Sequence, residues 1–344
     1  MTTTSIIRVN AARSASVAVL TLATVFAGML GPLQALVNGR LGSTLGDGHA
    51  AALISFGTGL VLMLVVVFAR KKTRLAFLAL PGQLWRGDLP RWNFFAGLCG
   101  AVIVLSEGVT VGELGVAVFQ TSLISGLVIS GVLCDRLGIG VSVKQAITLQ
   151  RGIGAALAIG ATILVVSPSW SAPHMIALAI MPFVGGLLAG WQPAGNSEIG
   201  RLSGSMFVSI TWNFLIGFVA LGIVYLIRMA ATGAHFQLPE TWWLYLGGPL
   251  GLLSIALMAL LVRSLGLLLL GLASTAGQLI GSVVIELAFP HGVTLHAVTF
   301  IGAFVALAAA AIAMIPSRTT IPSDQAPVRD EVHAGAPERR VDHE

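Results

Sequence analysis

Long apolar stretches recur along most of the chain, separated by short polar or glycine-containing segments. A helix needs about 20 apolar residues to cross a hydrocarbon core of roughly 30 Å. Lipid offers the backbone no hydrogen-bonding partner, so each N–H and C=O must be paired within the spanning segment, which favours helices. The pattern predicts ten transmembrane helices, over residues 15–38, 49–69, 92–111, 114–134, 146–167, 174–196, 205–228, 242–262, 265–288 and 293–315. Very short turns between the third and fourth helices, and between the eighth and ninth, predict tight helical hairpins.

The composition identifies lipid as the main solvent. Hydrophobic residues make up 56% of the chain and charged residues 10%, whereas a soluble domain carries roughly 25% charged residues. The 41 glycines suit closely packed membrane helices. We therefore predict an all-α integral membrane protein.

No motif indicates a cofactor, a metal or catalysis. Cys99 and Cys134 both lie in apolar stretches and have neither metal-site spacing nor the pattern of a disulfide framework. The sequence contains no GxxxxGKS/T phosphate loop, no HExxH and no aspartate pair suited to magnesium and a pyrophosphate. The prediction is a protein that is not an enzyme and has no cofactor or metal.

The Lys and Arg residues predict how the chain is oriented. When the loops are assigned alternately to the two sides, seventeen of the nineteen Lys and Arg residues fall on one side, and Arg40 and Arg228 fall on the other. The positive-inside rule makes the rich side cytoplasmic, which places both termini inside a bacterial inner membrane. The net charge of +5 is therefore explained by topology, with no nucleic-acid partner. Residues 1–14 are a cytoplasmic segment, and the polar, proline-containing residues 316–344 are predicted to be a disordered cytoplasmic tail.

An internal duplication divides the membrane part into residues 15–167 and 174–315. At an offset of 158 residues, GPLQALVNGRLG lies over AGWQPAGNSEIG. A second alignment, at an offset of 151, runs from Trp92 over Trp243 to Asp135 over Glu286, and the change of offset falls in a basic loop after Arg70. Each half carries five predicted helices, so the second half enters the membrane from the opposite side. Inverted repeats of this kind are typical of secondary transporters, whose substrate site lies between the halves.

Side-chain amides recur in the predicted helices. Gln34 and Asn38 are four residues apart and share one helix face, and Gln192 and Asn196 repeat the pair in the second half. Amides both donate and accept hydrogen bonds, so four of them around one cavity would bind a polar neutral or zwitterionic molecule. The alternative is that they bond neighbouring helices together. Further candidates for either role, or for stacking on a ligand in the case of the tryptophan, are Ser55, Asn213, Gln278 and Trp191.

One carboxylate is a candidate for proton coupling. Glu107 lies inside the third predicted helix, where a charge is costly and a functional role is the default. Its repeat counterpart is Met258, so such a device would be asymmetric, and its position toward the outer end leaves solvation as the alternative. For the acidic residues near helix ends we expect solvated side chains: Glu113, Asp135, Glu198 and Glu286.

The segments GPLQALVNGRLG and AGQLIGSVVIELAF, in a chain with five helices per repeat, resemble the YdcZ-type family of bacterial inner-membrane proteins in the drug/metabolite transporter superfamily. The resemblance covers residues 15–315. It implies a ten-helix transporter fold that moves a small molecule, with export as the expected direction, and it implies no substrate. The first half departs from the pattern at Leu127, which stands where the second half has Gln278.

The prediction is a secondary transporter of a small polar metabolite or drug-like compound that works by alternating access. It would act as a monomer, because one chain carries both repeats, with membrane lipid around it and a proton or ion gradient as a candidate driving force. The alternatives are a membrane-embedded enzyme acting on lipid or isoprenoid, and a membrane subunit that does not transport.

Overall fold

A computed structural model describes residues 18–139, 144, 146–169, 172–233, 235–289 and 296–315. Every regular element in these residues is helical. The predicted N-terminal segment 1–14 and the tail 316–344 lie outside the described residues. After a helix over residues 18–28, the elements are α2 (Leu30–Leu45), α3 (Gly48–Phe68), α4 (Lys71–Arg86), α5 (Arg91–Phe94), α6 (Gly97–Leu114), α7 (Val116–Leu137), α8 (Leu149–Val166), η1 (Ser167–Ser169), α9 (Pro173–Ala189), α10 (Gln192–Ser203), α11 (Met206–Thr232), η2 (Trp242–Leu246), α12 (Gly247–Ala288) and α13 (Ala297–Ala313).

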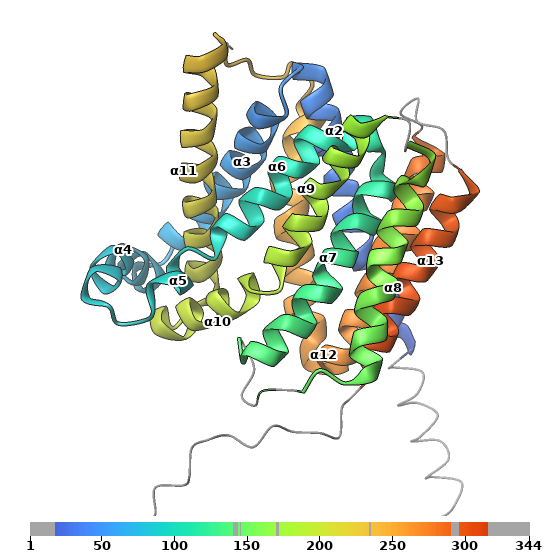
Figure 1. Cartoon of the computed structure of the whole chain (residues 1–344). Coiled ribbons are helices and arrows are strands. Elements are labelled where there is room, and N and C mark those ends of the chain that lie inside the picture. Colours follow the sequence, from blue (N-terminus) through green and yellow to red (C-terminus); the bar gives the residue numbers. More distant parts are fainter. Residues whose placement is uncertain are drawn as a thin grey trace, which may run out of the picture.

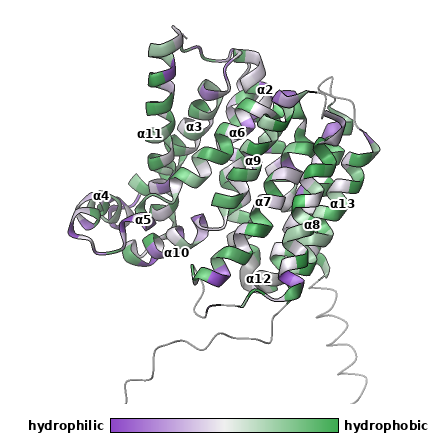
Figure 2. Cartoon of the chain, in the orientation of Figure 1, coloured by the Kyte–Doolittle hydropathy of each residue, from purple (hydrophilic) through white to green (hydrophobic). Residues whose placement is uncertain are grey.

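The helices form one bundle in which most of the long elements run between two opposite ends (Figure 1). Short α5, α4 and α10 lie at one end, and the turn between α2 and α3 lies at the other. Figure 2 shows hydrophobic residues along the lengths of the long helices and hydrophilic residues concentrated around α4, α5 and α10 and near helix ends. An apolar middle between two polar ends is the distribution that a bilayer requires.

Eight helices of the described chain are long and apolar enough to cross a membrane, and the apolar helices Trp242–Met258 and Ala297–Ala313 are shorter. Large apolar side chains point outward from these helices, as Phe304 does with 72% of its surface exposed. A soluble protein rarely exposes so much contiguous apolar surface. The predicted all-helical membrane fold is confirmed at this level.

The first helix of each half is interrupted next to its amide pair. The regular α-helix is interrupted by a turn at Met29, before α2, and at Gly190 and Trp191, between α9 and α10, although all three residues keep right-handed helical φ and ψ. Proline follows each break, as Pro32 and Pro193, and proline is tolerated in the first turn of a helix because the N–H it lacks has no partner there. Gln34 and Gln192 therefore lie just after a local interruption within a longer span, Ala18–Leu45 in the first half and Pro173–Ser203 in the second.

One predicted hairpin has a clear turn and the other does not. Gly115 separates α6 from α7 with φ of +81°, a conformation that suits glycine. In the second half the helical assignment continues through 42 residues as α12. The prediction of a non-helical turn near residue 264 is therefore wrong. The chain nevertheless reverses, because Gly247 and then Gly251 approach Asn38 and Gln34, whereas Gly277 and Gly281 approach Val25 and Met29. The start of α12 therefore runs antiparallel to the first helix, and its end runs parallel to it.

Residues 71–86 form helix α4, although the sequence predicts a basic loop after Arg70. Phe77 and Leu80 of this helix are buried in an apolar cluster with Trp212 of α11. The opposite side carries Trp85, with 84% of its surface exposed, and the lysines of the first turn. The helix is amphipathic and covers one end of the bundle.

Contacts between the halves recur at repeat-related positions. Phe56 of α3 and Phe214 of α11 pack with ring centroids 5.1 Å apart. A Cβ added to Gly59 would overlap Phe214, and one added to Gly217 would overlap Phe56. These two glycine contacts are related by the repeat, because Gly217 lies 158 positions after Gly59, and Phe214 lies 158 positions after Phe56. The middle of the bundle is thus built from two equivalent sets of glycine and phenylalanine contacts.

Candidate functional site

A cavity of about 230 Å³ lies between the two halves, among α2, α3, α6, α7, α10, α11 and α12. Since a water molecule occupies about 30 Å³ of liquid, the cavity has room for roughly eight waters or one small metabolite. Its walls mix aliphatic and aromatic side chains with amides and hydroxyls, as ligand cavities generally do. The polar residues that line it are Gln34, Ser55, Glu107, Gln120, Gln192, Asn196, Asn213, Ser254 and Gln278.

Most of the residues predicted from sequence lie at this cavity. Gln34, Gln192, Asn196, Ser55, Asn213 and Gln278 line it, and so does the predicted proton-coupling residue Glu107. Asn38 is fully buried directly behind Glu107, and Trp191 lies outside the lining. Residues from both halves are therefore brought together around one space, although they are far apart in the sequence.

Glu107 is held from α2 by the first amide pair. Its side chain is 4% exposed, and its Oε2 accepts hydrogen bonds from Asn38 Nδ2 at 2.6 Å and from Gln34 Nε2 at 3.4 Å. The solvated alternative for Glu107 does not apply, since the carboxylate faces the cavity rather than the surface. Asn38 thus bonds two helices together, and Gln34 both bonds helices and lines the cavity.

The second amide pair has no carboxylate to hold. Asn213 Nδ2 of α11 donates to Asn196 Oδ1 of α10 at 2.5 Å, and Ser209 Oγ donates to the Asn196 backbone carbonyl at 2.7 Å. Met258 occupies the position equivalent to Glu107. The two amide pairs are therefore matched in sequence, but only the first pair donates to a carboxylate.

Glycines let the amides reach the cavity. A Cβ on Gly100 would lie 3.0 Å from Gln192 Nε2, and a Cβ on the equivalent Gly251 would lie 2.8 Å from Gln34 Oε1. Any larger residue would push these amides aside. The matched glycines on α6 and α12, which are 151 positions apart as in the second sequence alignment, are thus part of the site.

Sequence reasoning missed Gln120 and Ser254. Gln120 is 1% exposed, lies on α7 and lines the cavity. It stands in the apolar run VAVFQTSL, so the rule that picked out Gln34, an amide inside a predicted span, could have found it. Ser254 carries no comparable signal, because small hydroxyls are common in membrane helices.

Trp191 serves packing in this conformation. Its ring lies 5.8 Å from that of Trp92, centroid to centroid, at the end of the bundle where α5 and α10 meet. Stacking on a ligand in the cavity is not available to it here, because it does not line that space.

The remaining acidic residues near helix ends differ in how far they reach the surface. Glu113 is exposed, and Glu198 pairs with Arg201 at 2.8 Å near the surface, as expected. Asp135 pairs with the buried Arg151 at 2.9 Å. The expectation of a solvated Glu286 is wrong, because this residue is 2% exposed and its Oε2 accepts from the backbone N–H of Val116 at 2.5 Å. Glu286 caps the N-terminus of α7, where a helix favours negative charge.

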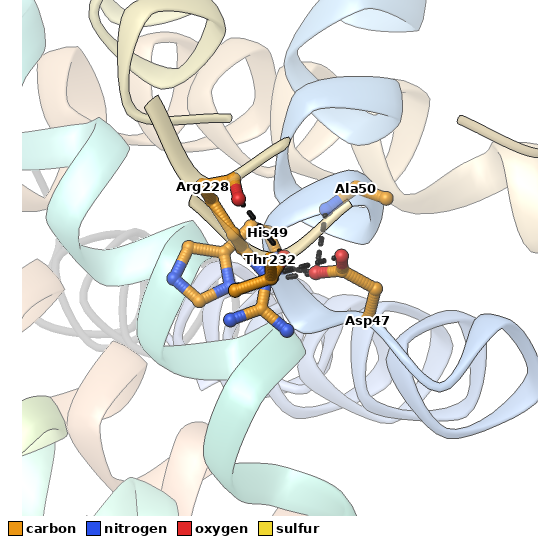
Figure 3. Close-up of polar contacts among 5 residues, drawn as sticks. All are labelled: Asp47, His49, Ala50, Arg228 and Thr232. Carbon is orange, nitrogen blue, oxygen red and sulfur yellow. Dashed lines mark hydrogen bonds and ion pairs between the residues drawn. The ribbon is translucent and has the colours of Figure 1, made fainter. Parts of the chain in front are cut away.

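An ion pair joins the halves at the end of the bundle that contains the α2–α3 turn (Figure 3). Asp47 accepts hydrogen bonds from the backbone N–H groups of His49 and Ala50 and so caps α3. Arg228 Nε of α11 donates to Asp47 Oδ2 at 3.2 Å. Burial raises the pKa of Asp47, but the hydrogen bonds from Arg228 and from these two backbone groups outweigh it and hold the pKa below its usual value.

At the same end, three helices approach closely enough for their backbones to touch. A Cβ on Gly48 would lie 2.5 Å from the Gly108 carbonyl group, and a Cβ on Gly42 would overlap the Gly108 carbonyl oxygen. Helices α2, α3 and α6 therefore touch without intervening side chains. The repeat counterpart of Gly42 is Gly200, whose added Cβ would meet the flexible side chain of Met206 instead.

Among the residues that the structure describes, no three His, Cys, Asp or Glu side chains gather in a way that could hold a metal ion.

A multi-pass helical membrane protein with a polar cavity between its halves has the architecture of a membrane transporter rather than of a soluble enzyme or binding module. The chain matches the family described as "Putative inner membrane exporter, YdcZ" over residues 19–164 and 177–315. It belongs to this family, as its sequence segments predicted, and it is a multi-pass inner-membrane protein. No match was found among curated proteins.

Proposed function

We propose that the protein is a secondary transporter that exports a small polar metabolite or drug-like compound across the inner membrane by alternating access. The observation that carries the proposal is the central cavity, which is lined by Gln34 from one half and by Gln192 and Asn196 from the other. A site shared by two halves can be exposed to either side when the halves rock against each other. Membership of the exporter family supports the direction.

The proposal includes ten transmembrane helices in two inverted repeats. It is supported by the repeat-related contacts, such as those between Phe56 and Phe214, and by the reversal of chain direction within α12. The two shorter apolar helices, Trp242–Met258 and Ala297–Ala313, would complete the count of ten. With both repeats in one chain, we propose that the monomer is the transporting unit.

We also propose that both termini are cytoplasmic and that the end with Asp47 and Arg228 faces outward. The distribution of Lys and Arg supports this orientation, because the opposite end carries the basic residues of α4, α5 and α10. In this assignment the backbone contact of Gly42 and Gly48 with Gly108 closes the outer side of the cavity.

The test begins with a metabolite comparison of cells that lack the protein and cells that overproduce it, which identifies the substrate and the direction. The flux of that substrate is then measured for the double variant Gln34→Ala/Gln192→Ala. We expect flux to be abolished while the protein remains inserted, because two amides of the cavity wall are removed. Gln237→Ala is the matched control, since that glutamine is exposed outside the bundle core. Normal flux in the double variant would refute the assignment of the site.

A further inference from the structure

The carboxylate in the cavity restricts the class of ligand more than the amides do. Among the described residues that line the cavity, Glu107 is the single ionisable one. Its hydrogen-bond donors, Asn38 and Gln34, are neutral amides, and none of the described residues that line the cavity carries a positive charge to balance the carboxylate. An isolated carboxylate away from water is costly unless a proton or another cation neutralises it.

The unused hydrogen-bonding groups of the cavity include acceptors. Asn38 and Gln34 both donate to Oε2 of Glu107, and neither of them donates to Oε1. Gln120 Oε1 is also buried without a hydrogen-bond partner. Buried acceptors without donors cost free energy, so a ligand that supplies N–H groups would bind more favourably than one that only accepts.

Two aromatic rings complete the site. Phe56 and Phe214 line the cavity, and their ring centroids are 5.1 Å apart. The face of an aromatic ring attracts a cation within about 6 Å, most strongly where water is excluded. A carboxylate, amide oxygens and aromatic rings around one small space are together complementary to an organic cation.

We propose that the cavity binds a small organic ammonium ion with at least one N–H, paired with Glu107. The amides alone favoured a neutral or zwitterionic ligand, and the position of Glu107 changes the expected charge. This inference rests on the proposed function, in which the cavity is the transport site. The ammonium and the proton compete for one carboxylate: the protonated Glu107 releases its proton when R–NH₃⁺ binds, and takes a proton up when R–NH₃⁺ leaves. One positive charge occupies the site in either state.

The test measures binding to the purified full-length protein in detergent, by the shift of its thermal unfolding midpoint. The probes are butylammonium chloride, 1-butanol as the neutral analogue of similar size, tetramethylammonium chloride as a cation without N–H, and sodium chloride for ionic strength. We expect butylammonium to raise the midpoint, tetramethylammonium to raise it less, and 1-butanol and sodium chloride to leave it unchanged. As the pH is lowered below the pKa of the carboxyl group, the butylammonium affinity should fall about tenfold per pH unit, because the ammonium must displace a proton.

Glu107→Gln should abolish the butylammonium shift, because the amide keeps hydrogen-bonding capacity but loses the charge. Glu113→Gln is the matched control on the same helix, since Glu113 is exposed outside the cavity, and it should respond as the native protein does. If Glu107→Gln does not fold, the comparison of butylammonium with 1-butanol across pH in the native protein decides the question.

An equal shift with 1-butanol, an undiminished shift in Glu107→Gln, or no shift with butylammonium would each overturn the ammonium assignment. The two proposals fail separately. Flux of a neutral compound without ammonium binding would overturn the ligand class and leave the transporter. Ammonium binding at Glu107 without flux of any compound in vesicles would retain the ligand class and overturn the transport function.

Discussion

Replacing Gly42 with alanine should open the outer side of the cavity. The added Cβ would overlap the carbonyl oxygen of Gly108, which belongs to the backbone of α6 and cannot rotate away. Helices α2 and α6 must therefore separate. Overpacking of this kind costs about 1–3 kcal/mol. The cost applies only to the closed arrangement, so the equilibrium between closed and open outer sides should shift by about 5- to 150-fold.

The assay is thiol labelling from the outside of intact cells. Cys99 and Cys134, both free and buried, are first replaced by alanine. Ser254→Cys then places a single thiol in the cavity wall. A membrane-impermeant maleimide should label this thiol faster in Gly42→Ala than in the parent, by a factor within the range of the equilibrium shift.

Gly200→Ala provides the control because Gly200 is the repeat counterpart of Gly42. Its added Cβ meets the end of the Met206 side chain, which can turn aside. Labelling from outside should then stay close to that of the parent. If Gly42→Ala is inserted normally and its labelling rate is unchanged, the contact with Gly108 does not close the outer side.

Three further substitutions test individual contacts. Asp47→Asn keeps a good helix cap but loses the ion pair with the partly exposed Arg228, which should cost about 0.2–1 kcal/mol. The folded-state pKa of Asp47 is lowered, so the stability contributed by its carboxylate is present above the unfolded pKa of about 3.9 and is lost as the pH falls through the folded-state pKa. Thermal unfolding between pH 6 and pH 3 should show this loss of stability in the native protein and not in Asp47→Asn. Glu286→Ala leaves the N–H of Val116 without its acceptor and should destabilise the protein by about 1–3 kcal/mol, seen as a lower unfolding midpoint, whereas a midpoint like the native one would refute the capping role. Trp191→Phe should keep substrate flux within about twofold in vesicles, since the ring packs outside the cavity, and a large loss would place it in the substrate path.

Sequence alone predicted the features that depend on local pattern. Apolar runs of about 20 residues located the membrane helices, because burial in lipid depends on composition and length. The four-residue spacing of Gln34 and Asn38 placed them on one helix face. Helix α4 was missed because its basic residues interrupt the apolar pattern, and the burial of Phe77 and Leu80 depends on α11, which is distant in the sequence.

The partners of the site residues could not be predicted, because they depend on how helices pack. Nothing near Glu107 in the sequence indicates that Asn38, 69 residues away, donates to it. The burial of Glu286 follows from the docking of α7 against α12, and its neighbours in sequence suggested a helix end near water. Side-chain hydrogen bonds inside a membrane protein cross from one helix to another, and a helix-by-helix reading does not contain them.

Glu107, which only the first half carries, connects the ligand site with the helices that meet at the outer side. Glu107 of α6 is held by Asn38 and Gln34 of α2, and the backbones of these two helices touch at Gly108 and Gly42. The hydrogen bonds and the glycine contact therefore stabilise the same closed arrangement. An ammonium that pairs with Oε1 of Glu107 withdraws charge from the carboxylate, which weakens the hydrogen bonds that Asn38 and Gln34 donate to Oε2 across α2 and α6. A ligand shifts a conformational equilibrium by its difference in affinity for the two states, so this weakening would favour outward opening when the ligand is bound. The second half has Met258 in place of a carboxylate and lacks this bridge, which would make opening on the two sides energetically unequal even with matched backbones.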